Sequence, residues 1–264
     1  MHTFCFFIAF HNSVFLLLVC HILGVSVVYD IIKKLRNKTL LCIGDKGGKY
    51  MDWEFAIPHL LSGFIPAAGA LALYFIALHV IGKKQTISHI VASFVFCFYL
   101  IGVLTVTGVC LRATFSPNIV YIPFVDMIRG PMDTALNIFL FVPMGFFLPV
   151  LYEKYDKIGR VALVGFLISL SIEIAQMFGF GATDINDLIT NTLGACLGYG
   201  IYKLLYRAIP NSWIKKIRVE GSQCYFELLF FWIGSLVLML TIQLHIFDAL
   251  FTAGMSGGEI QEWK

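Results

Sequence analysis

Long apolar stretches separated by short polar joints dominate this chain of 264 residues. Each stretch meets or approaches the roughly 20 apolar residues that an α-helix needs to cross the hydrocarbon core of a bilayer. Helices are expected because a helix satisfies its own backbone hydrogen bonds where no water is present. We therefore predict an all-α fold, a polytopic transmembrane helical bundle of about seven spans. The predicted spans lie near residues 3–28, 57–81, 90–111, 134–152, 161–178, 187–206 and 225–247.

The composition favours the same class of protein. Hydrophobic residues make up 59% of the chain and charged residues only 13%, whereas a soluble domain carries about 25% charged residues. The net charge of +3 is spread over several loops, so no basic block suggests a nucleic-acid partner. The 7 cysteines form no Cys-x-x-Cys pair, which is typical of small buried side chains rather than of a zinc site. We expect membrane lipids as neighbours, no nucleic-acid partner, and no metal or cofactor.

The charges of the joints predict an orientation in the membrane. The joints at 82–85, 153–160 and 208–222 carry lysines and arginines, whereas the joint at 179–186 carries an acid and no base. Lys and Arg concentrate in cytoplasmic loops. We therefore predict that the three basic joints are cytoplasmic and that the acidic joint lies outside. The charged loop 33–53 is also basic and conflicts with this assignment, so the topology of the N-terminal region stays open.

The fifth stretch contains polar residues at membrane depth. Ser169, Glu173 and Gln176 are spaced by four and three residues, so they share one face of a helix. Glu173 is about five residues from the end of its span, which places it roughly 7–8 Å below the interface. Ionisable groups at that depth are costly and tend to be kept only where a function or a partner holds them. This face is therefore predicted to line a polar pocket.

The sixth stretch carries a matching polar stripe. Its acids, one amide and two glycines recur at spacings of three, four, three and four, which is one face of a helix. The two glycines form a small-xxx-small pair that lets another helix approach closely, so we assign them to helix packing. If the fifth and sixth helices form a hairpin, Glu173 and Gln176 can meet Asp187 and Asn191 of this stripe near the outer leaflet. The stripe consists of Asp184, Asp187, Asn191, Gly194 and Gly198.

Two further residues upstream complete the predicted binding cluster. Asn137 lies at the entrance to the fourth stretch, and Arg129 is the nearest plausible cation in the sequence. We predict that Arg129 neutralises part of the acidic charge. The predicted binding cluster thus comprises Glu173, Gln176, Asp184, Asp187, Asn191, Asn137 and Arg129.

Simpler interpretations stand beside this one. Asp184 follows Thr183 at the start of a helix, where an acid is favoured by capping and by the helix dipole. Glu173 and Gln176 could form a structural hydrogen bond between helices, worth ~0.6 kcal/mol in a membrane bundle. The histidines inside the spans are isolated from one another in sequence and are interpreted as packing residues: His11, His21, His79 and His245.

Four motifs, taken in order, resemble the VanZ-like family of membrane proteins. An N-I-x-L-F-x-P-x-G-F-type segment covers 136–149, an E-x-x-Q motif covers 171–176, and a D-x-x-D-x-x-x-N-x-x-G-A motif covers 184–195. A segment similar to the family's I-P-F motif precedes them at 121–124. The family commonly has an arginine three residues before the first acid of the third motif, where this chain has Gly181.

The resemblance suggests a division of the chain and a location. Residues 1–92 would form an N-terminal membrane region, 93–207 the VanZ-like domain, and 208–264 a C-terminal span with a tail. A multi-pass protein of the bacterial plasma membrane is implied, with a link to resistance to glycopeptides such as teicoplanin. The motifs indicate neither catalytic residues nor an oligomeric state.

Three functions are compatible with these residues. The preferred hypothesis is that an outer-leaflet polar pocket binds the headgroup of a cell-envelope lipid or a lipid-linked peptidoglycan precursor. A membrane-embedded enzyme is the first alternative, with the carboxylates holding a hard cation or acting as an acid or base on a lipid-linked substrate. A transporter or flippase is the second alternative, in which Glu173 would titrate during turnover.

Overall fold

The computed structural model of the protein describes residues 53–109, 119–120, 131–177, 183–207 and 211–247. Its long helices are α3 (Trp53–Val80), α4 (Ile87–Val106), α6 (Pro131–Leu151), α7 (Ile158–Gln176), α8 (Ile185–Tyr206) and α10 (Gln223–Thr241). The short elements are the strands β1 (Ile119–Val120) and β2 (Thr183–Asp184), the 3-10 helix η1 (Glu153–Tyr155), and the helices α9 (Asn211–Ile217) and α11 (Gln243–Phe247).

The all-α, multi-pass architecture predicted from the sequence is confirmed. Among the described helices, 5 are long and apolar enough to cross a membrane, namely α3 from His59 onward, α4, α6 from Thr134 onward, α7 and α10. They correspond to the predicted spans 57–81, 90–111, 134–152, 161–178 and 225–247. The predicted span 187–206 is the long helix α8, whose polar stripe lowers its hydropathy. The predicted span 3–28, the loop 33–53 and the motif at 121–124 lie outside the described residues.

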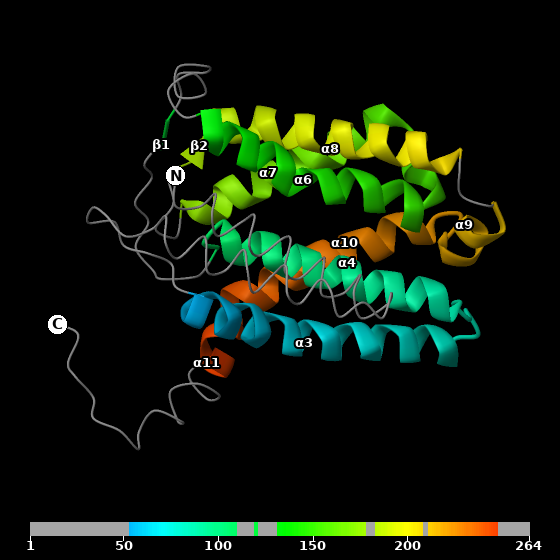
Figure 1. The fold of residues 1–264 in the computed structure, drawn as a ribbon. Coiled ribbons are helices and arrows are strands. Elements are labelled where there is room, and N and C mark those ends of the chain that lie inside the picture. Colours follow the sequence, from blue (N-terminus) through cyan, green and yellow to red (C-terminus); the bar gives the residue numbers. More distant parts are fainter. Residues whose placement is uncertain (1–52, 110–118, 121–130, 178–182, 208–210, 248–264) are drawn as a thin grey trace, which may run out of the picture.

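The helices form two groups that lie side by side (Figure 1). The first, which we call the three-helix unit, consists of α6, α7 and α8, and α8 packs along the length of α6. The second consists of α3, α4, α10 and α11. In this second group α10 and α11 return from the C-terminal part of the chain to pack on α3 and α4. This second group therefore contains helices that precede the three-helix unit in the sequence and helices that follow it.

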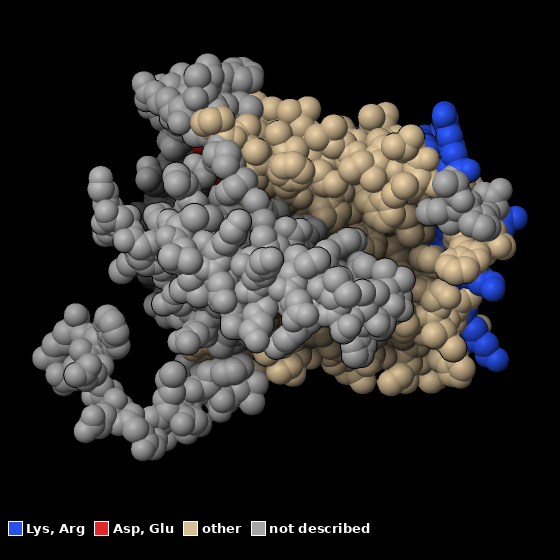
Figure 2. Space-filling view, in the orientation of Figure 1, with Lys and Arg blue, Asp and Glu red and all other residues tan. Residues whose placement is uncertain are grey.

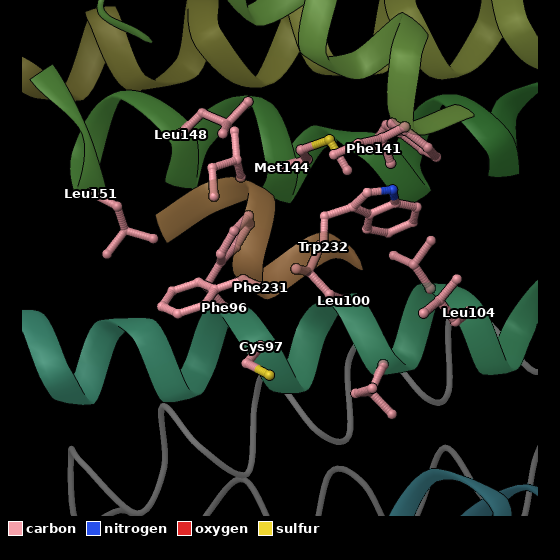
Figure 3. Close-up of a cluster of buried hydrophobic side chains, with 14 of the residues drawn as sticks. Phe96, Cys97, Leu100, Leu104, Phe141, Met144, Leu148, Leu151, Phe231 and Trp232 are labelled. Carbon is pink, nitrogen blue, oxygen red and sulfur yellow. The ribbon is translucent and has the colours of Figure 1, made fainter. Parts of the chain in front are cut away.

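Buried side chains fill the space between α4, α6 and α10 (Figure 3). Trp232 of α10 faces this core and also donates its indole N–H to Ser171 Oγ on α7 at 3.0 Å. Because lipid is as apolar as these side chains, close van der Waals packing rather than escape from water holds such helices together. Other core residues drawn in Figure 3 are Phe96, Leu100 and Leu104 of α4, Phe141, Met144 and Leu148 of α6, and Phe231 of α10.

Glycines bring the backbones of α6 and α8 into direct contact. A side chain at Gly194 would overlap the carbonyl group of Ile138, and one at Gly198 would overlap that of Val142. From the other side, a side chain at Gly145 of α6 would overlap the carbonyl of Ala195. Because Gly194 meets Ile138 and Gly198 meets Val142, the two helices run parallel. The intervening helix α7 therefore runs in the opposite direction.

One end of the bundle gathers the three basic joints. Val219 donates its N–H to Leu151 O at 2.8 Å, and Glu153 donates to Val219 O at 3.0 Å. The turn between α3 and α4 reaches the same place, since Thr86 Oγ1 donates to Lys216 O on α9. Figure 2 shows Lys and Arg at this end, which we call the basic end. The described part of the acidic joint, residues 183–186, lies at the opposite end, so the two kinds of joint are separated as the sequence predicted.

Candidate functional site

Asp184 shapes the start of α8 at the end of the bundle opposite the basic end. It is the N-cap residue, and its Oδ1 accepts hydrogen bonds from the Asn186 backbone N–H at 2.8 Å and from Asn186 Nδ2 at 2.9 Å. The preceding β2 pairs in parallel with β1, with Val120 opposite Asp184. Asp184 therefore performs the capping role that the sequence allowed, and the strand pair fixes the chain where it enters the helix.

Glu173 joins the end of α7 to the start of α8. Its side chain is only 2% exposed, and its Oε2 accepts the backbone N–H of Asp184 at 2.9 Å. A buried carboxylate needs such donors, because removing it from water without them is costly. Glu173 thus lies beside the N-terminus of α8.

Asp187 and Asn137 connect α8 to α6. Asn137 Nδ2 donates a hydrogen bond to Asp187 Oδ1, and both side chains are half-buried. Asp187 lies in the first turn of α8, where the exposed N–H groups of the helix favour a negative charge. This pair brings residues from the first and third motifs of the family signature into contact.

Asn191 lies one turn deeper in α8 and is 4% exposed. Its Nδ2 donates to Ser169 Oγ on α7 at 2.9 Å, and that hydroxyl donates to Asp187 O at 3.4 Å. The Oδ1 of Asn191 is buried and accepts no hydrogen bond within the described part of the chain. Most buried polar atoms in proteins have a partner, so this oxygen is an open acceptor between α7 and α8.

Two residues of the predicted cluster are placed differently or not at all. Gln176 Nε2 donates to the carbonyl of Thr107, the C-cap residue of α4, at 2.9 Å. It therefore links α7 to α4, and within the described residues it forms no hydrogen bond with the stripe on α8. Arg129 lies outside the described residues.

The residues that do converge form what we call the outer polar cluster. They come from all three helices of the three-helix unit and lie within about two helical turns of its end. Within the described ranges, no group of three or more His, Cys, Asp or Glu side chains is arranged to hold a metal ion. The cluster is rich in hydrogen-bond acceptors and consists of Asn137, Ser169, Glu173, Asp184, Asp187 and Asn191.

A second buried polar cluster, which the sequence reasoning missed, lies near the basic end. Glu227 of α10 is 0% exposed and His89 of α4 is 1% exposed, and His89 Nε2 lies 2.7 Å from Glu227 Oε1. Tyr74 donates its hydroxyl to Glu227 Oε2 at 3.2 Å, and Tyr152 donates to Glu227 Oε1 at 3.3 Å. We call these four residues the inner polar cluster. Glu227 lies inside the apolar stretch 225–247, so the depth argument that identified Glu173 could have found it.

The hydrogen-bond partners locate the protons of the inner polar cluster. His89 Nδ1 lies 2.6 Å from Ile217 O, and a carbonyl only accepts, so this nitrogen carries a proton. Burial, followed by the charge of Glu227, raises the pKa of Tyr152 well above its usual value, so its hydroxyl stays protonated and can donate. Tyr74 and Tyr152 are therefore donors to Glu227, and His89 is held between Glu227 and the carbonyl of Ile217.

The positions of these clusters can be compared with known proteins. The family model described as VanZ/LLP1 matches residues 68–206, which is more than half of the chain. This chain belongs to the VanZ/LLP1 family. The matched region contains every residue of the outer polar cluster, together with His89, but ends before Glu227. Together with the apolar helices, this membership identifies a multi-pass protein of the bacterial cell membrane.

A curated relative supports the same assignment. The chain is 32% identical over 111 residues to Protein VanZ of Enterococcus faecium. The aligned part is 42% of this chain and 62% of the relative, so the chain spans less than two thirds of that protein's length. No solved structure matches this chain.

Proposed function

We propose that the outer polar cluster binds the headgroup of a cell-envelope lipid or a lipid-linked cell-wall precursor at the outer leaflet. Through that binding the protein contributes to resistance to glycopeptides such as teicoplanin. The observation that carries the proposal is the buried Asn191 Oδ1, which has no hydrogen-bond donor among the described residues. A donor from a bound headgroup would satisfy it.

The composition of the cluster supports a ligand of this kind. A structural contact between helices needs one polar pair, whereas α6, α7 and α8 here contribute several groups at one depth. Carboxylates and amide oxygens accept hydrogen bonds, so they complement the hydroxyl, amide and ammonium donors of sugar- and peptide-bearing headgroups. Sites built in helical bundles typically use such inward-facing side chains from several helices.

The position of the cluster supports a membrane-bound source of the ligand. It lies near the end of three membrane-level helices, so a headgroup can reach it while its acyl chains remain in the bilayer. The exposed faces of α7 and α8 beside it are apolar, with Ile174 49% exposed and Leu193 48% exposed. Membership of the VanZ/LLP1 family is consistent with the link to the cell envelope that the sequence resemblance suggested.

The test replaces Asn191 by leucine, which keeps the side-chain size and removes the amide. A susceptible host that produces the wild-type chain should tolerate more teicoplanin than the empty host, and N191L should lose that tolerance. Purified protein should likewise lose photo-crosslinking to a lipid-linked precursor. The matched control is Leu197→Asn, on the exposed face of the same helix, which should keep both properties. Wild-type tolerance and crosslinking in an inserted N191L protein would end the proposal.

A further inference from the structure

We propose that α9 and the basic joints around it form a surface that binds anionic phospholipid headgroups of the inner leaflet. This surface is at the basic end, distant from the outer polar cluster, and it does not depend on the function proposed above. Its chemistry is that of a phosphate-bearing lipid interface, recognised by lysines and by one exposed indole.

Several hydrogen bonds fix α9 against the bundle. His89 Nδ1 of α4 donates to Ile217 O at 2.6 Å, and Thr86 Oγ1 donates to Lys216 O. Arg218, just after α9, donates from Nη2 to Pro149 O at 2.7 Å. Both carbonyls at the C-terminal end of α9 are therefore held by the start of α4. The surface is presented in one orientation, so a ligand need not order it.

The fixed orientation divides α9 into two faces. Ile214 is only 6% exposed and packs toward the bundle, with Ile217 half-buried one turn later. Trp213 is 67% exposed, and Lys215 and Lys216 are exposed beside it. Tryptophan is enriched where acyl chains meet headgroups, because its ring is apolar and its N–H is polar. An outward Trp next to two lysines is the combination expected at an anionic membrane surface.

The surroundings of α9 strengthen the positive charge. Figure 2 shows Lys and Arg gathered at the end of the molecule where α9 lies. The acids that lie here are fewer, and Asp156 is already paired with Lys203 at 2.6 Å. Clusters of bases next to membrane helices attract anionic lipids. The described bases at this end are Lys83, Lys84, Lys154, Lys157, Arg160, Lys203, Arg207, Lys215, Lys216 and Arg218.

The position of α9 in the chain favours lipid over a soluble protein partner. The helix connects α8 to α10, and its neighbours are the ends of α4 and α6, so it lies at the level where the spans leave the bilayer. At that level the exposed Trp213 meets headgroups rather than bulk water. A soluble partner would have to displace those headgroups first.

The experiment measures which lipid surrounds Trp213. The full chain is reconstituted in vesicles of phosphatidylcholine with phosphatidylglycerol, and one of the two lipids at a time is brominated in its acyl chains. Bromine quenches the fluorescence of nearby indole rings. The chain has 4 tryptophans, so the fluorescence of W213F is subtracted from that of the wild-type chain to obtain the signal of Trp213. We expect brominated phosphatidylglycerol to quench Trp213 more than an equal mole fraction of brominated phosphatidylcholine. Added salt should reduce the difference.

Variants test whether the effect belongs to α9. Lys215→Gln with Lys216→Gln should abolish the preference for phosphatidylglycerol, and Lys215→Arg with Lys216→Arg should keep it. The comparison variant, Lys154→Gln with Lys157→Gln, removes the same charge from the joint after α6 and should weaken the preference less, because it leaves both lysines of α9 in place. Equal quenching by the two lipids in the wild-type chain would overturn the proposal. So would an equal loss of the preference in the comparison variant, because the effect would then come from diffuse charge at this end and not from α9.

Discussion

Glu227 illustrates how a single buried residue can determine stability in this protein. It is 0% exposed, lies 2.7 Å from His89, and accepts hydrogen bonds from Tyr74 and Tyr152. Glu227→Ala would remove the acceptor of both tyrosine hydroxyls and the carboxyl partner of the buried His89 ring. Removing the shared partner of such a buried polar cluster costs about 3–5 kcal/mol. We expect that loss in the free energy of unfolding, measured by denaturant titration in detergent micelles.

The control for this prediction is Glu220→Ala, because Glu220 is exposed at the same end of the bundle. Its change in unfolding free energy should be within about 0.5 kcal/mol of zero. The double variant His89→Ala with Glu227→Ala should be less destabilised than the sum of the single variants, since their energies are coupled. Additive effects would show that the two side chains do not act as a pair.

The sequence predicted part of the outer polar cluster for a clear physical reason. Glu173, Asp187 and Asn191 interrupt apolar stretches, and helical spacing places them on inward faces. Spacing does not reveal which neighbour a face meets, so the partner of Gln176 on α4 could not be predicted. The role of Ser169 as a bridge between Asn191 and Asp187 also required coordinates.

At the scale of elements, the contact between α6 and α8 depends on small residues. A side chain at Gly194 would overlap the carbonyl of Ile138, whereas a side chain at Gly200 on the same helix meets nothing within 4 Å. Gly194→Ala should therefore destabilise the protein by about 1–3 kcal/mol, because the backbones must separate. Gly200→Ala should be neutral or stabilising by up to about 1 kcal/mol, since alanine favours helix.

The measurement is again unfolding in detergent, with helical content followed by circular dichroism. The two variants make the same chemical change on one helix, so any difference in stability reports the contact with α6. Equal stabilities for the two variants would contradict the tight backbone packing. Retention of the fold by Gly194→Leu would contradict it more strongly.

The elements were more predictable than their arrangement. Apolar length located α3, α4, α6, α7 and α10, because the bilayer sets the required number of residues. The short helix α9 has no such signal, since it has only 7 residues and the burial of Ile214 arises only in the folded bundle. The packing of α10 against α3 and α4 depends on contacts between distant parts of the chain, which local patterns do not encode.

At the scale of the whole molecule, the distribution of charge predicts the sidedness of the bundle. The joint between α3 and α4 and the helix α9 lie at the basic end, and the start of α8 lies at the other end. We expect Lys84→Cys and Lys215→Cys to react only with a membrane-permeant thiol reagent in intact cells. Ile185→Cys, at a position that is 39% exposed, should react with an impermeant reagent.

This labelling is best done in a background without the native cysteines, of which Cys97 and Cys224 are buried. Labelling of all three positions by the permeant reagent alone would contradict the expected orientation of the three-helix unit. The reverse pattern, with Lys84→Cys and Lys215→Cys reached from outside, would place the outer polar cluster in the inner leaflet.

The parallel pairing of α6 and α8 also determines how the chain can be assembled during synthesis. The 5 helices apolar enough to partition alone do not include α8. During synthesis α8 therefore needs a protein surface in the membrane to pack on, and α6, whose carbonyls at Ile138 and Val142 meet the glycines of α8, is that surface. Because α6 precedes α8 by two helices in the chain, α6 is synthesised first and is available when α8 is inserted. The order of the elements along the chain thus places the packing surface on α6 before α8, the long helix that is not apolar enough to insert alone.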